Sequence, residues 1–213
     1  MTAINFGTDL KGQVALVTVA SAGLGVRFAK VLAQCGAKVA ITARRMEKLE
    51  ALAKEIRVEG GEVLPLQLDV TQADQLLDVV GKVEAALGTV TILVNNAGIP
   101  DAQRAIKMSV DLIDRVIDTN LRAPYILSCE VARRLIATKK PGRIVNIASS
   151  AAFEYGGNGA ALYSTTKGAV VRMTQALSVE WAPFNINVNA IAPGAFSSEM
   201  MDGMLARVGD ISQ

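Results

Sequence analysis

Short apolar segments alternate with longer amphipathic segments along most of this chain. Short apolar runs between turn residues are typical of buried strands, whereas apolar residues at helical spacing are typical of helices that cover a core. Strands that alternate with helices are joined by right-handed crossovers, which build a parallel sheet with helices on both faces. The pattern predicts a doubly wound α/β domain with strands at 13–18, 38–42, 62–67, 90–94, 143–147 and 186–191 and helices at 23–34, 46–58, 71–87, 110–138 and 163–181.

Turn signals refine two of these helices. Thr71 followed by Asp74 fits a capping box, in which a hydroxyl and an acid three residues later bond the backbone at the start of a helix. Pro124 stands inside the long helix 110–138, and proline removes one of the hydrogen bonds of a helix. We therefore expect the first helix to start at its threonine and the second to be broken near its proline.

The size and charge of the chain favour one globular domain without a polyanionic partner. It has 213 residues, of which 51% are apolar and 20% charged, an ordinary composition for a folded domain. Its 22 basic and 20 acidic residues leave a net charge of only +2, so no bulk attraction to nucleic acid or acidic lipid is expected. The sequence shows neither a signal peptide nor an apolar run long enough to cross a bilayer. We expect a cytoplasmic protein with neither nucleic-acid nor membrane partners.

Histidine is absent, and this absence narrows the possible chemistry. Ser-His-Asp and Cys-His nucleophiles both need a histidine, and so does a histidine-ligated zinc site. The two cysteines, Cys35 and Cys129, are too few for a zinc site and are expected to be free thiols in a reducing compartment. Acid/base chemistry must therefore use Tyr, Lys, Asp, Glu or Cys, and no metal is expected.

The turn between the first strand and the first helix consists almost entirely of small residues. Residues 18–25 read Thr-Val-Ala-Ser-Ala-Gly-Leu-Gly. In open parallel sheets, ligands bind at the carboxyl ends of the strands. Small residues let backbone N–H groups approach a pyrophosphate there, and the start of the following helix attracts negative charge. Tight packing of the strand against the helix is the alternative explanation for the same glycines.

Two arginines and no acid stand at the end of the second strand, where the ribose of a dinucleotide cofactor is recognised. Enzymes that use NAD usually carry Asp or Glu about 20 residues after the glycines, to bond the ribose 2′-OH. Arg44 and Arg45 occupy this place here, and arginine pairs bidentately with phosphate. They predict a preference for NADP(H) over NAD(H), unless both are solvated charges ahead of the next helix.

Several further motifs follow in a fixed order. After the fourth strand come Asn95-Asn96-Ala97-Gly98 and then Asn120, Ser150, Tyr163, Lys167 and Pro193-Gly194. With Gly23-Leu24-Gly25 at the start, this order resembles that of the classical short-chain dehydrogenases/reductases over about residues 11–198. The resemblance implies a Rossmann-type, three-layer αβα fold with strand order 3-2-1-4-5-6, followed in the family by a seventh strand. It also implies NAD(P)(H)-dependent hydride transfer between a small-molecule carbonyl and a secondary alcohol, in a homodimer or homotetramer.

Tyr163 and Lys167 stand four residues apart and therefore share one face of a helix. The pKa of a free tyrosine is about 10, too high for a base near neutrality, and a nearby cation favours the tyrosinate. By the resemblance, Tyr163 exchanges a proton with the substrate oxygen, and Lys167 lowers its pKa and bonds the nicotinamide ribose. The alternative for the pair is a core aromatic beside a solvated lysine.

The resemblance gives two more residues a catalytic role. Ser150, 13 residues before the tyrosine, would hydrogen-bond the same substrate oxygen, although either Ser149 or Ser150 could be a turn residue. The spacing favours Ser150. Asn120 would hold a water that links Lys167 to solvent, or it would bond the backbone at a bend in its helix.

The resemblance also implies where the cofactor lies. Asp69 would bond the adenine amino group, with capping of the next helix as the alternative. The Asn-Asn-Ala-Gly turn would pack against the adenosine half, Pro193 and Gly194 would lie beside the nicotinamide, and Ser198 would touch its carboxamide. The complete expected set is Thr18, Ala20, Ser21, Gly23, Leu24, Gly25, Arg44, Arg45, Asp69, Val70, Asn96, Ala97, Gly98, Tyr163, Lys167, Pro193, Gly194 and Ser198.

The chain departs from the family pattern in two places. Val19 stands where the family usually has glycine, and a β-branched residue disfavours a positive φ and crowds a phosphate-binding loop. Either cofactor binding is weakened, or the loop follows a different path. The chain also stops at Gln213, before the seventh strand of the family. Either the polypeptide is longer and this sequence is truncated, which we expect, or the sheet ends one strand short and its sixth strand is exposed.

The substrate is the least determined part of the prediction. By position, Glu154, Tyr155, Asn158 and residues 195–204 would line its pocket, with Phe196, Met200, Met201 and Met204 as an apolar cover or as ordinary packing. Two other functions stay open. One is a catalytically silent nucleotide-binding or oligomerising protein, disabled by Val19 and the short end. The other is an extended-family epimerase or dehydratase, against which the close spacing of the two glycines argues.

Overall fold

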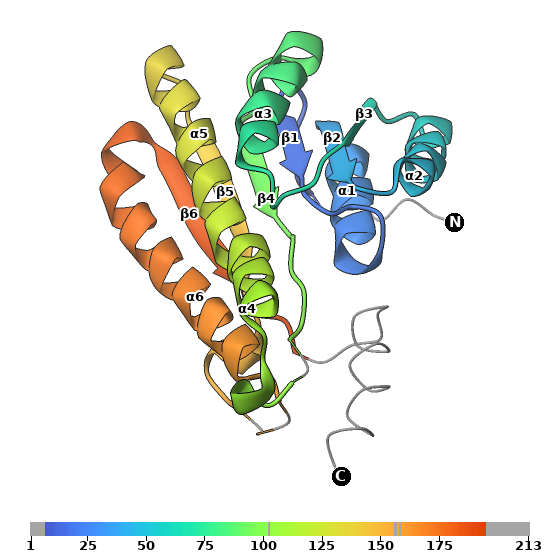
Figure 1. Cartoon of the computed structure of the whole chain (residues 1–213). Coiled ribbons are helices and arrows are strands. Elements are labelled where there is room, and N and C mark those ends of the chain that lie inside the picture. Colours follow the sequence, from blue (N-terminus) through green and yellow to red (C-terminus); the bar gives the residue numbers. More distant parts are fainter. Residues whose placement is uncertain (1–6, 102, 156, 158, 195–213) are drawn as a thin grey trace.

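The computed structural model describes residues 7–101, 103–155, 157 and 159–194. Over this part of the chain, six parallel strands form one sheet in the order β3-β2-β1-β4-β5-β6, and helices cover both of its faces (Figure 1). The strands are β1 (Val14–Val17), β2 (Lys38–Ala43), β3 (Val63–Gln67), β4 (Ile92–Asn95), β5 (Gly142–Ile147) and β6 (Ile186–Ile191). The doubly wound, Rossmann-type fold and its strand order are therefore confirmed.

The burial of each strand follows its place in the sheet. All four residues of β1 are buried, and Leu16 pairs in register with Leu93 of β4. Such central strands are apolar throughout because helices cover both of their faces. β6 lies at one edge of the described sheet, and its buried Ile186 and Val188 alternate with exposed asparagines. A continuous apolar run thus marks a strand with helices on both faces, and alternation marks a strand with one exposed face.

The helices pack in two groups and enclose one apolar cluster on each face of the sheet. On one side, Val17 and Ile41 of the sheet meet Leu49 and Ile56, and on the other side Leu93 is part of a larger cluster. None of the helices in the described ranges has the length and apolar character that crossing a bilayer requires. The first face is covered by α1 (Gly23–Gln34) and α2 (Met46–Val58), and the second by α3 (Ala73–Leu87), α5 (Ala123–Thr138) and α6 (Ala161–Trp181).

The start of α3 differs from the prediction. The helix begins at Ala73 rather than at Thr71, and no side chain caps its first turn. Thr71 instead bonds Asp69, whose Oδ1 accepts the threonine N–H at 3.0 Å and its hydroxyl at 2.8 Å. The predicted capping box is therefore wrong, because an aspartate two residues earlier closes a turn of its own and engages the threonine first.

The long helix predicted over 110–138 is broken just before Pro124, as expected. α4 (Val110–Ile117) runs into a π-helical turn, η2 (Asp118–Arg122), after which α5 begins. Proline has no amide proton for the i→i−4 hydrogen bond, and the wider turn accommodates it. Single π turns are frequent at functional sites, and this one holds Asn120.

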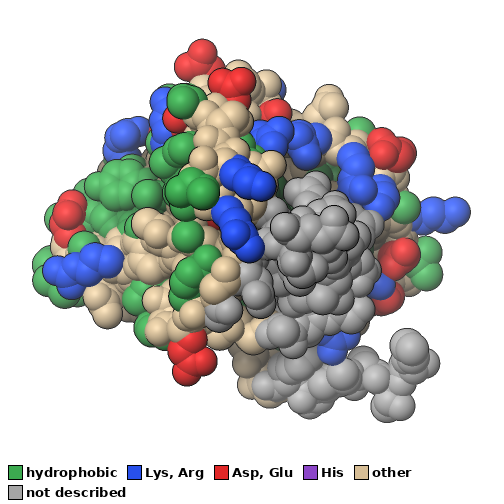
Figure 2. Space-filling view, turned by 60° about the horizontal axis from the view of Figure 1, so that its bottom comes forward, with side chains coloured by type: hydrophobic (Ala, Val, Ile, Leu, Met, Phe, Trp, Pro, Cys, Tyr) green, Lys and Arg blue, Asp and Glu red, His purple; other side chains and the backbone are tan. Residues whose placement is uncertain are grey.

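The carboxyl ends of the strands gather at one end of the molecule, the lower end in Figure 1. The strand order reverses here between β1 and β4, which makes this edge the topological switch point of the sheet. Figure 2 looks toward this end and shows Lys and Arg side chains (blue) near the centre of the view. A ligand of a doubly wound sheet is expected at this edge.

Candidate active site

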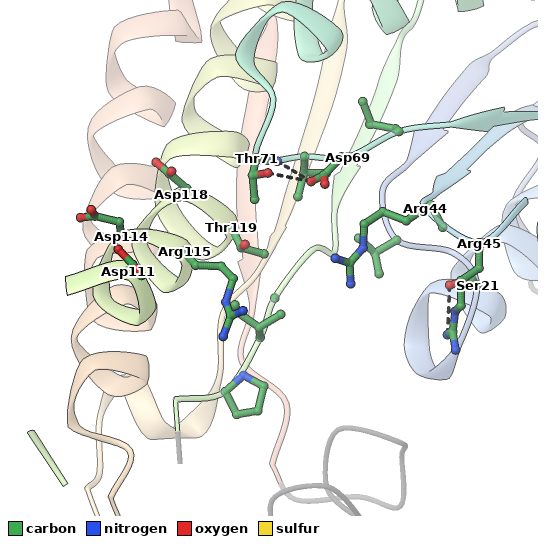
Figure 3. A pocket seen from close by; sticks show the side chains of 17 residues that line it. Ser21, Arg44, Arg45, Asp69, Thr71, Asp111, Asp114, Arg115, Asp118 and Thr119 are labelled. Carbon is green, nitrogen blue, oxygen red and sulfur yellow. Dashed lines mark hydrogen bonds between the residues drawn. The ribbon is translucent and has the colours of Figure 1, made fainter. Parts of the chain in front are cut away.

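A pocket of about 780 Å³ opens at the carboxyl ends of the central strands (Figure 3). Its walls come from the turn after β1, the ends of β2 and β3, the loop after β4 and the start of the helix that η2 interrupts. A cavity of this size at the switch point has room for a large part of a dinucleotide. The residues predicted to bind the cofactor that line it are Ser21, Arg44, Arg45, Asp69, Val70 and Gly98.

The turn after β1 is held tightly against the loop after β4. The Asn96 side chain donates from Nδ2 to the carbonyl of Thr18 at 3.1 Å and to that of Val19 at 3.0 Å. A Cβ added to Gly25 would lie only 2.7 Å from this Nδ2 and 2.9 Å from the Cα of Ala20. Packing alone therefore requires glycine at position 25. This agrees with the alternative explanation of the glycines, tight packing of the strand against the helix.

Thr18, Gly23 and Leu24 of this turn support the pocket without lining it. The buried Thr18 Oγ1 accepts the backbone N–H of Asn96 at 2.9 Å and of Ala97 at 3.1 Å, which ties the ends of β1 and β4 together. Leu24 packs against the core at the start of α1, and Gly23 has a φ of +57°, which favours glycine. Direct contact of these residues with a cofactor stays a prediction.

Val19 takes up the backbone conformation that glycine usually provides in such a turn. Its φ is +52°, and the left-handed region costs a residue with a side chain about 1–2 kcal/mol. The bonds from Asn96 and the packing of the valine side chain against the core hold it there. The turn therefore tolerates valine in a strained conformation, and the Val19 side chain lines the pocket.

The two arginines at the end of β2 point in different directions. Figure 3 shows the guanidinium group of Arg44 reaching into the pocket, while its backbone carbonyl accepts a hydrogen bond from Gln67 at 3.1 Å. Arg45 precedes α2 and donates to the Ser21 hydroxyl at 3.3 Å, beside the turn after β1. Of the two, Arg44 is the better placed to meet a phosphate within the pocket.

Asp69 lies on the pocket wall after β3. Its Oδ1 accepts both hydrogen bonds from Thr71 described above, and its backbone N–H donates to the Gln75 side chain at 3.1 Å. Asp69 therefore stabilises the turn in which it lies. Val70 beside it is buried, and the contact of Asp69 with adenine stays a prediction.

Tyr163 and Lys167 lie in the first two turns of α6, with their side chains adjacent. Lys167 Nζ is 5.7 Å from the centre of the Tyr163 ring and donates a 2.7 Å hydrogen bond to the carbonyl of Ile147, at the end of β5. Lys167 is only 3% exposed, whereas Tyr163 is half-buried. The lysine is thus fixed by its hydrogen bond to the end of β5, and the tyrosine stays partly exposed.

The serine beside the tyrosine hydroxyl is Ser149 and not the predicted Ser150. The Ser149 side chain hydrogen-bonds that of Tyr163 and also accepts the N–H of Ala151 at 3.2 Å. Ser150 is exposed and begins a short 3-10 turn, η3 (Ser150–Ala152). The prediction rested on a 13-residue spacing counted through the loop between η3 and α6, and the path of a loop does not follow from its length.

Burial acts on both ionisable groups of the pair. It raises the pKa of Tyr163 above its usual value near 10; the hydrogen bond with Ser149 opposes this, and the negative charge of Asp101 adds to it. Burial also lowers the pKa of Lys167 to about 8, because the ammonium group loses hydration. Desolvation, the largest effect on Tyr163, therefore works against the lowered tyrosine pKa that the resemblance implies.

The buried lysine predicts that stability rises with pH in an alkaline window. The pKa of Lys167 is about 8 in the folded chain and near 10.5 when the chain is unfolded, so the folded state binds fewer protons between these values. Folding is then favoured as the pH rises, and from about pH 7.5 to 9.5 the free energy of unfolding should increase by roughly 2 kcal/mol. Urea unfolding at the two pH values measures the increase, which Lys167→Met should abolish. A wild-type stability that stays flat across this window would contradict the prediction.

Asn120 joins three parts of the site. Its Oδ1 accepts the Ile99 N–H at 2.8 Å, and its Nδ2 donates to the Ile99 carbonyl at 2.9 Å and to the Thr166 hydroxyl at 3.2 Å. A Cβ added to Gly98 would lie 3.3 Å from Lys167 Nζ and 3.8 Å from Asn120 Oδ1, so glycine leaves the space between them open. These bonds are structural, but they reach the loop after β4 and α6 and not the backbone of the helix that carries Asn120. The part of Asn120 in a water relay stays a prediction.

Pro193 and Gly194 follow β6 and reach the same end of the sheet. The Pro193 carbonyl accepts the N–H of Ser150 at 2.9 Å, which places this turn beside η3. Glu154 and Tyr155 are exposed just after η3. Ser198, Asn158 and the predicted pocket segment 195–204 lie outside the described residues.

The sequence profile of the short chain dehydrogenase family matches residues 13–208. The chain belongs to the classical short-chain dehydrogenase/reductase family. It is 35% identical to a 2-dehydro-3-deoxy-D-gluconate 5-dehydrogenase from Formosa agariphila, over 89% of this chain and 72% of the relative. It is 37% identical to a 3-oxoacyl-(acyl-carrier-protein) reductase from Rickettsia bellii, over 91% of this chain and 77% of the relative.

A solved structure also resembles this short-chain dehydrogenase/reductase closely. It is that of a protein from Beutenbergia cavernae described as an NAD(P)-dependent gluconate 5-dehydrogenase, with NADP bound at low occupancy. The two share a TM-score of 0.86 and 34% identity, over 96% of this chain and 82% of the other. Family membership supports a nicotinamide-dependent oxidoreductase that interconverts hydroxyl and carbonyl groups.

Sequence reasoning missed some of the residues that shape the site of this short-chain dehydrogenase/reductase. Asp101, three residues after the Asn-Asn-Ala-Gly turn, is buried against the start of α6, and no local motif marks it. Thr119 could have been found, because it stands directly before Asn120. A whole wall of the pocket was also missed, formed by Asp111, Asp114, Arg115, Asp118 and Thr119.

Proposed function

We propose that this short-chain dehydrogenase/reductase interconverts a small-molecule carbonyl compound and its secondary alcohol, with NADP(H) preferred over NAD(H). The observation that carries the proposal is the cluster at the start of α6. There the half-buried Tyr163 lies close to the Ser149 hydroxyl and to the buried Lys167 ammonium group. Such a cluster supplies a proton, a hydrogen-bond donor and a positive charge at one place.

Each residue of the cluster has a separate role in proton transfer. When bound, the nicotinamide cofactor supplies or accepts the hydride. In reduction, the Tyr163 hydroxyl gives its proton to the carbonyl oxygen, and the Ser149 hydroxyl donates a hydrogen bond to the same oxygen as negative charge develops there. The charge of Lys167 stabilises the tyrosinate that remains. In oxidation, Tyr163 takes the proton back from the alcohol.

The residues around the pocket suit a dinucleotide cofactor that carries an additional phosphate on its ribose. The turn after β1 is built from small residues at the start of α1, where backbone N–H groups and the helix dipole favour phosphate. Arg44 reaches into the pocket where the ribose of the cofactor is expected, and no acidic side chain stands beside it on β2. The structurally similar Beutenbergia cavernae protein holds NADP, which also supports this choice.

Arg44→Ser tests the proposed cofactor preference. We expect the variant to bind NADPH about 30-fold more weakly, since a charge-assisted bond to phosphate contributes about 2 kcal/mol, and to bind NADH as the wild type does. Titration of nicotinamide fluorescence with each nucleotide measures both constants without a known substrate. The control is Arg143→Ser, which removes an exposed arginine at the opposite end of the sheet. If the wild type binds NADH more tightly, the phosphate role of Arg44 is wrong and the oxidoreductase proposal still stands.

One observation favours a catalytically silent, nucleotide-binding alternative. Val19 is strained and lines the pocket at the place where a phosphate would approach the turn. If neither nucleotide binds in the same titration, this alternative gains support over the proposed reaction. The homodimer or homotetramer implied by the resemblance stays a prediction, which light scattering of the purified chain tests.

A further inference from the structure

A carboxylate from outside α6 caps the start of that helix. Asp101, in the loop after β4, is only 2% exposed. Its Oδ2 accepts the backbone N–H of Leu162 at 2.9 Å and of Tyr163 at 3.1 Å, across 61 residues of chain. The first N–H groups of a helix have no partner within the helix, and a negative charge near them is favourable. Asp101 thus takes the place of an N-cap side chain, which Ala160 cannot provide.

The segment that carries Asp101 is itself fixed within the site. Asn120 bonds both the N–H and the carbonyl of Ile99, and Gly98 lies against Lys167 Nζ. Within four residues, the loop after β4 therefore contacts Lys167 through Gly98 and the backbone of Tyr163 through Asp101. A shift of this loop would move the first turn of α6 and the tyrosine with it.

A neutral group would suffice if capping were the whole role of this residue. α4 is capped by its own Ser109, whose hydroxyl accepts the N–H of Leu112 at 3.3 Å. The carboxylate of Asp101 differs from such a cap in bringing a negative charge to the backbone N–H of Tyr163. We therefore ask what this charge does to the tyrosine.

The titratable groups around Tyr163 come from several elements. Lys167 lies one turn further along α6, Ser149 comes from the end of β5 and Asp101 from the loop after β4. η2 presents the neutral amide of Asn120 to this helix, while its charged Asp118 and Arg122 pair with each other at 3.4 Å. A buried negative charge favours the protonated tyrosine, so Asp101 raises the pKa of Tyr163, whereas the hydrogen bond with Ser149 lowers it.

We propose that Asp101 is a positioning residue, which holds Tyr163 through its backbone and, by its buried negative charge, raises the pH at which the tyrosine exchanges its proton. The inference rests on the proposed function, in which Tyr163 is the acid/base of the reaction. Loss of the charge alone should make the tyrosinate form at lower pH. Loss of the cap as well should also impair the placement of the tyrosine.

Asp101→Asn separates charge from capping, because the amide oxygen can still accept both N–H groups. The tyrosinate titration is followed by its ultraviolet absorbance in the cofactor-free chain, with the signal of Tyr163→Phe subtracted. We expect the midpoint of the Tyr163 titration to fall by about 0.5 to 1 pH unit in Asp101→Asn. This is the size of effect expected when one negative charge is removed near a partly buried tyrosine. The pH profile of kcat for alcohol oxidation should shift equally. Asp101→Ala should show the shift and a further loss of kcat of about tenfold, as expected for a misplaced catalytic group.

The control is Asp78→Asn, which removes an equal charge from an exposed ion pair with Lys82 on α3 and should leave both midpoints in place. An unshifted midpoint in Asp101→Asn, with or without a loss of stability, overturns the proposal and leaves a helix cap only. Asp101→Ser, a neutral cap of smaller size, gives the same test if the asparagine variant does not fold. An inactive wild type would refute the proposed function, whereas the absorbance titration would still decide the inference about Asp101.

Discussion

Replacing Tyr163 with phenylalanine is expected to lower kcat by about three orders of magnitude. Phenylalanine keeps the ring that packs beside Lys167 and removes only the hydroxyl that bonds Ser149. Proton transfer by a positioned side chain contributes about 10²- to 10⁴-fold to a rate, and no histidine is available in the chain to replace it. The measurement is steady-state reduction of a carbonyl substrate found by screening with NADPH.

The variant should keep its cofactor affinity, because the hydroxyl lies outside the pocket walls around Arg44. Tyr125→Phe is the matched control, since Tyr125 is an exposed tyrosine on α5 and should lose no activity. If Tyr163→Phe retained more than a tenth of the wild-type kcat, another group would have to supply the proton. The proposed reaction would then lose its central residue.

Removing the Ser149 hydroxyl should have the second-largest effect. We expect Ser149→Ala to lower kcat/KM by about 100-fold, which is the usual consequence of losing one donor to a developing oxyanion. Ser150→Ala, its neighbour and matched control, should change kcat/KM by less than about threefold, because its side chain is exposed and η3 begins there. Steady-state kinetics of both variants against the wild type measures the difference.

The comparison of the two serines also tests the local geometry. Ser149→Thr keeps a hydroxyl and should recover part of the lost activity, whereas a purely structural role of Ser149 at the start of η3 would show mainly as lower stability. A larger loss in Ser150→Ala than in Ser149→Ala would contradict the position assigned here. The 13-residue spacing to Tyr163 would then be the better guide.

Local patterns predicted much of the fold. The apolar runs of the strands and the helical spacing between them gave element positions close to those observed, because each pattern repeats the geometry of its own element. The break before Pro124 followed from a missing amide proton. The Thr71 capping box failed, because Asp69, two residues earlier in the same turn, bonds Thr71 before the helix begins.

Only part of the site could be predicted from residues that are close together in the sequence. Tyr163 and Lys167 are neighbours by helix geometry alone, so their pairing could be predicted from a four-residue spacing. The directions of the two adjacent arginines, Arg44 into the pocket and Arg45 toward Ser21, depend on how β2 ends and α2 begins against the turn after β1. Which of two adjacent serines meets the tyrosine depends on the path of a loop.

The sequence by itself thus determined the order of strands and helices, the family, and the residue types that we propose for the chemistry. Each of these rests on regular spacing or on motifs within a few residues. Only the tertiary structure decided that Ser149 bonds Tyr163, that Val19 adopts a glycine conformation, and that Asp101 caps α6 across 61 residues. Such contacts depend on loop paths and on packing between elements distant in the chain, and no local pattern records either.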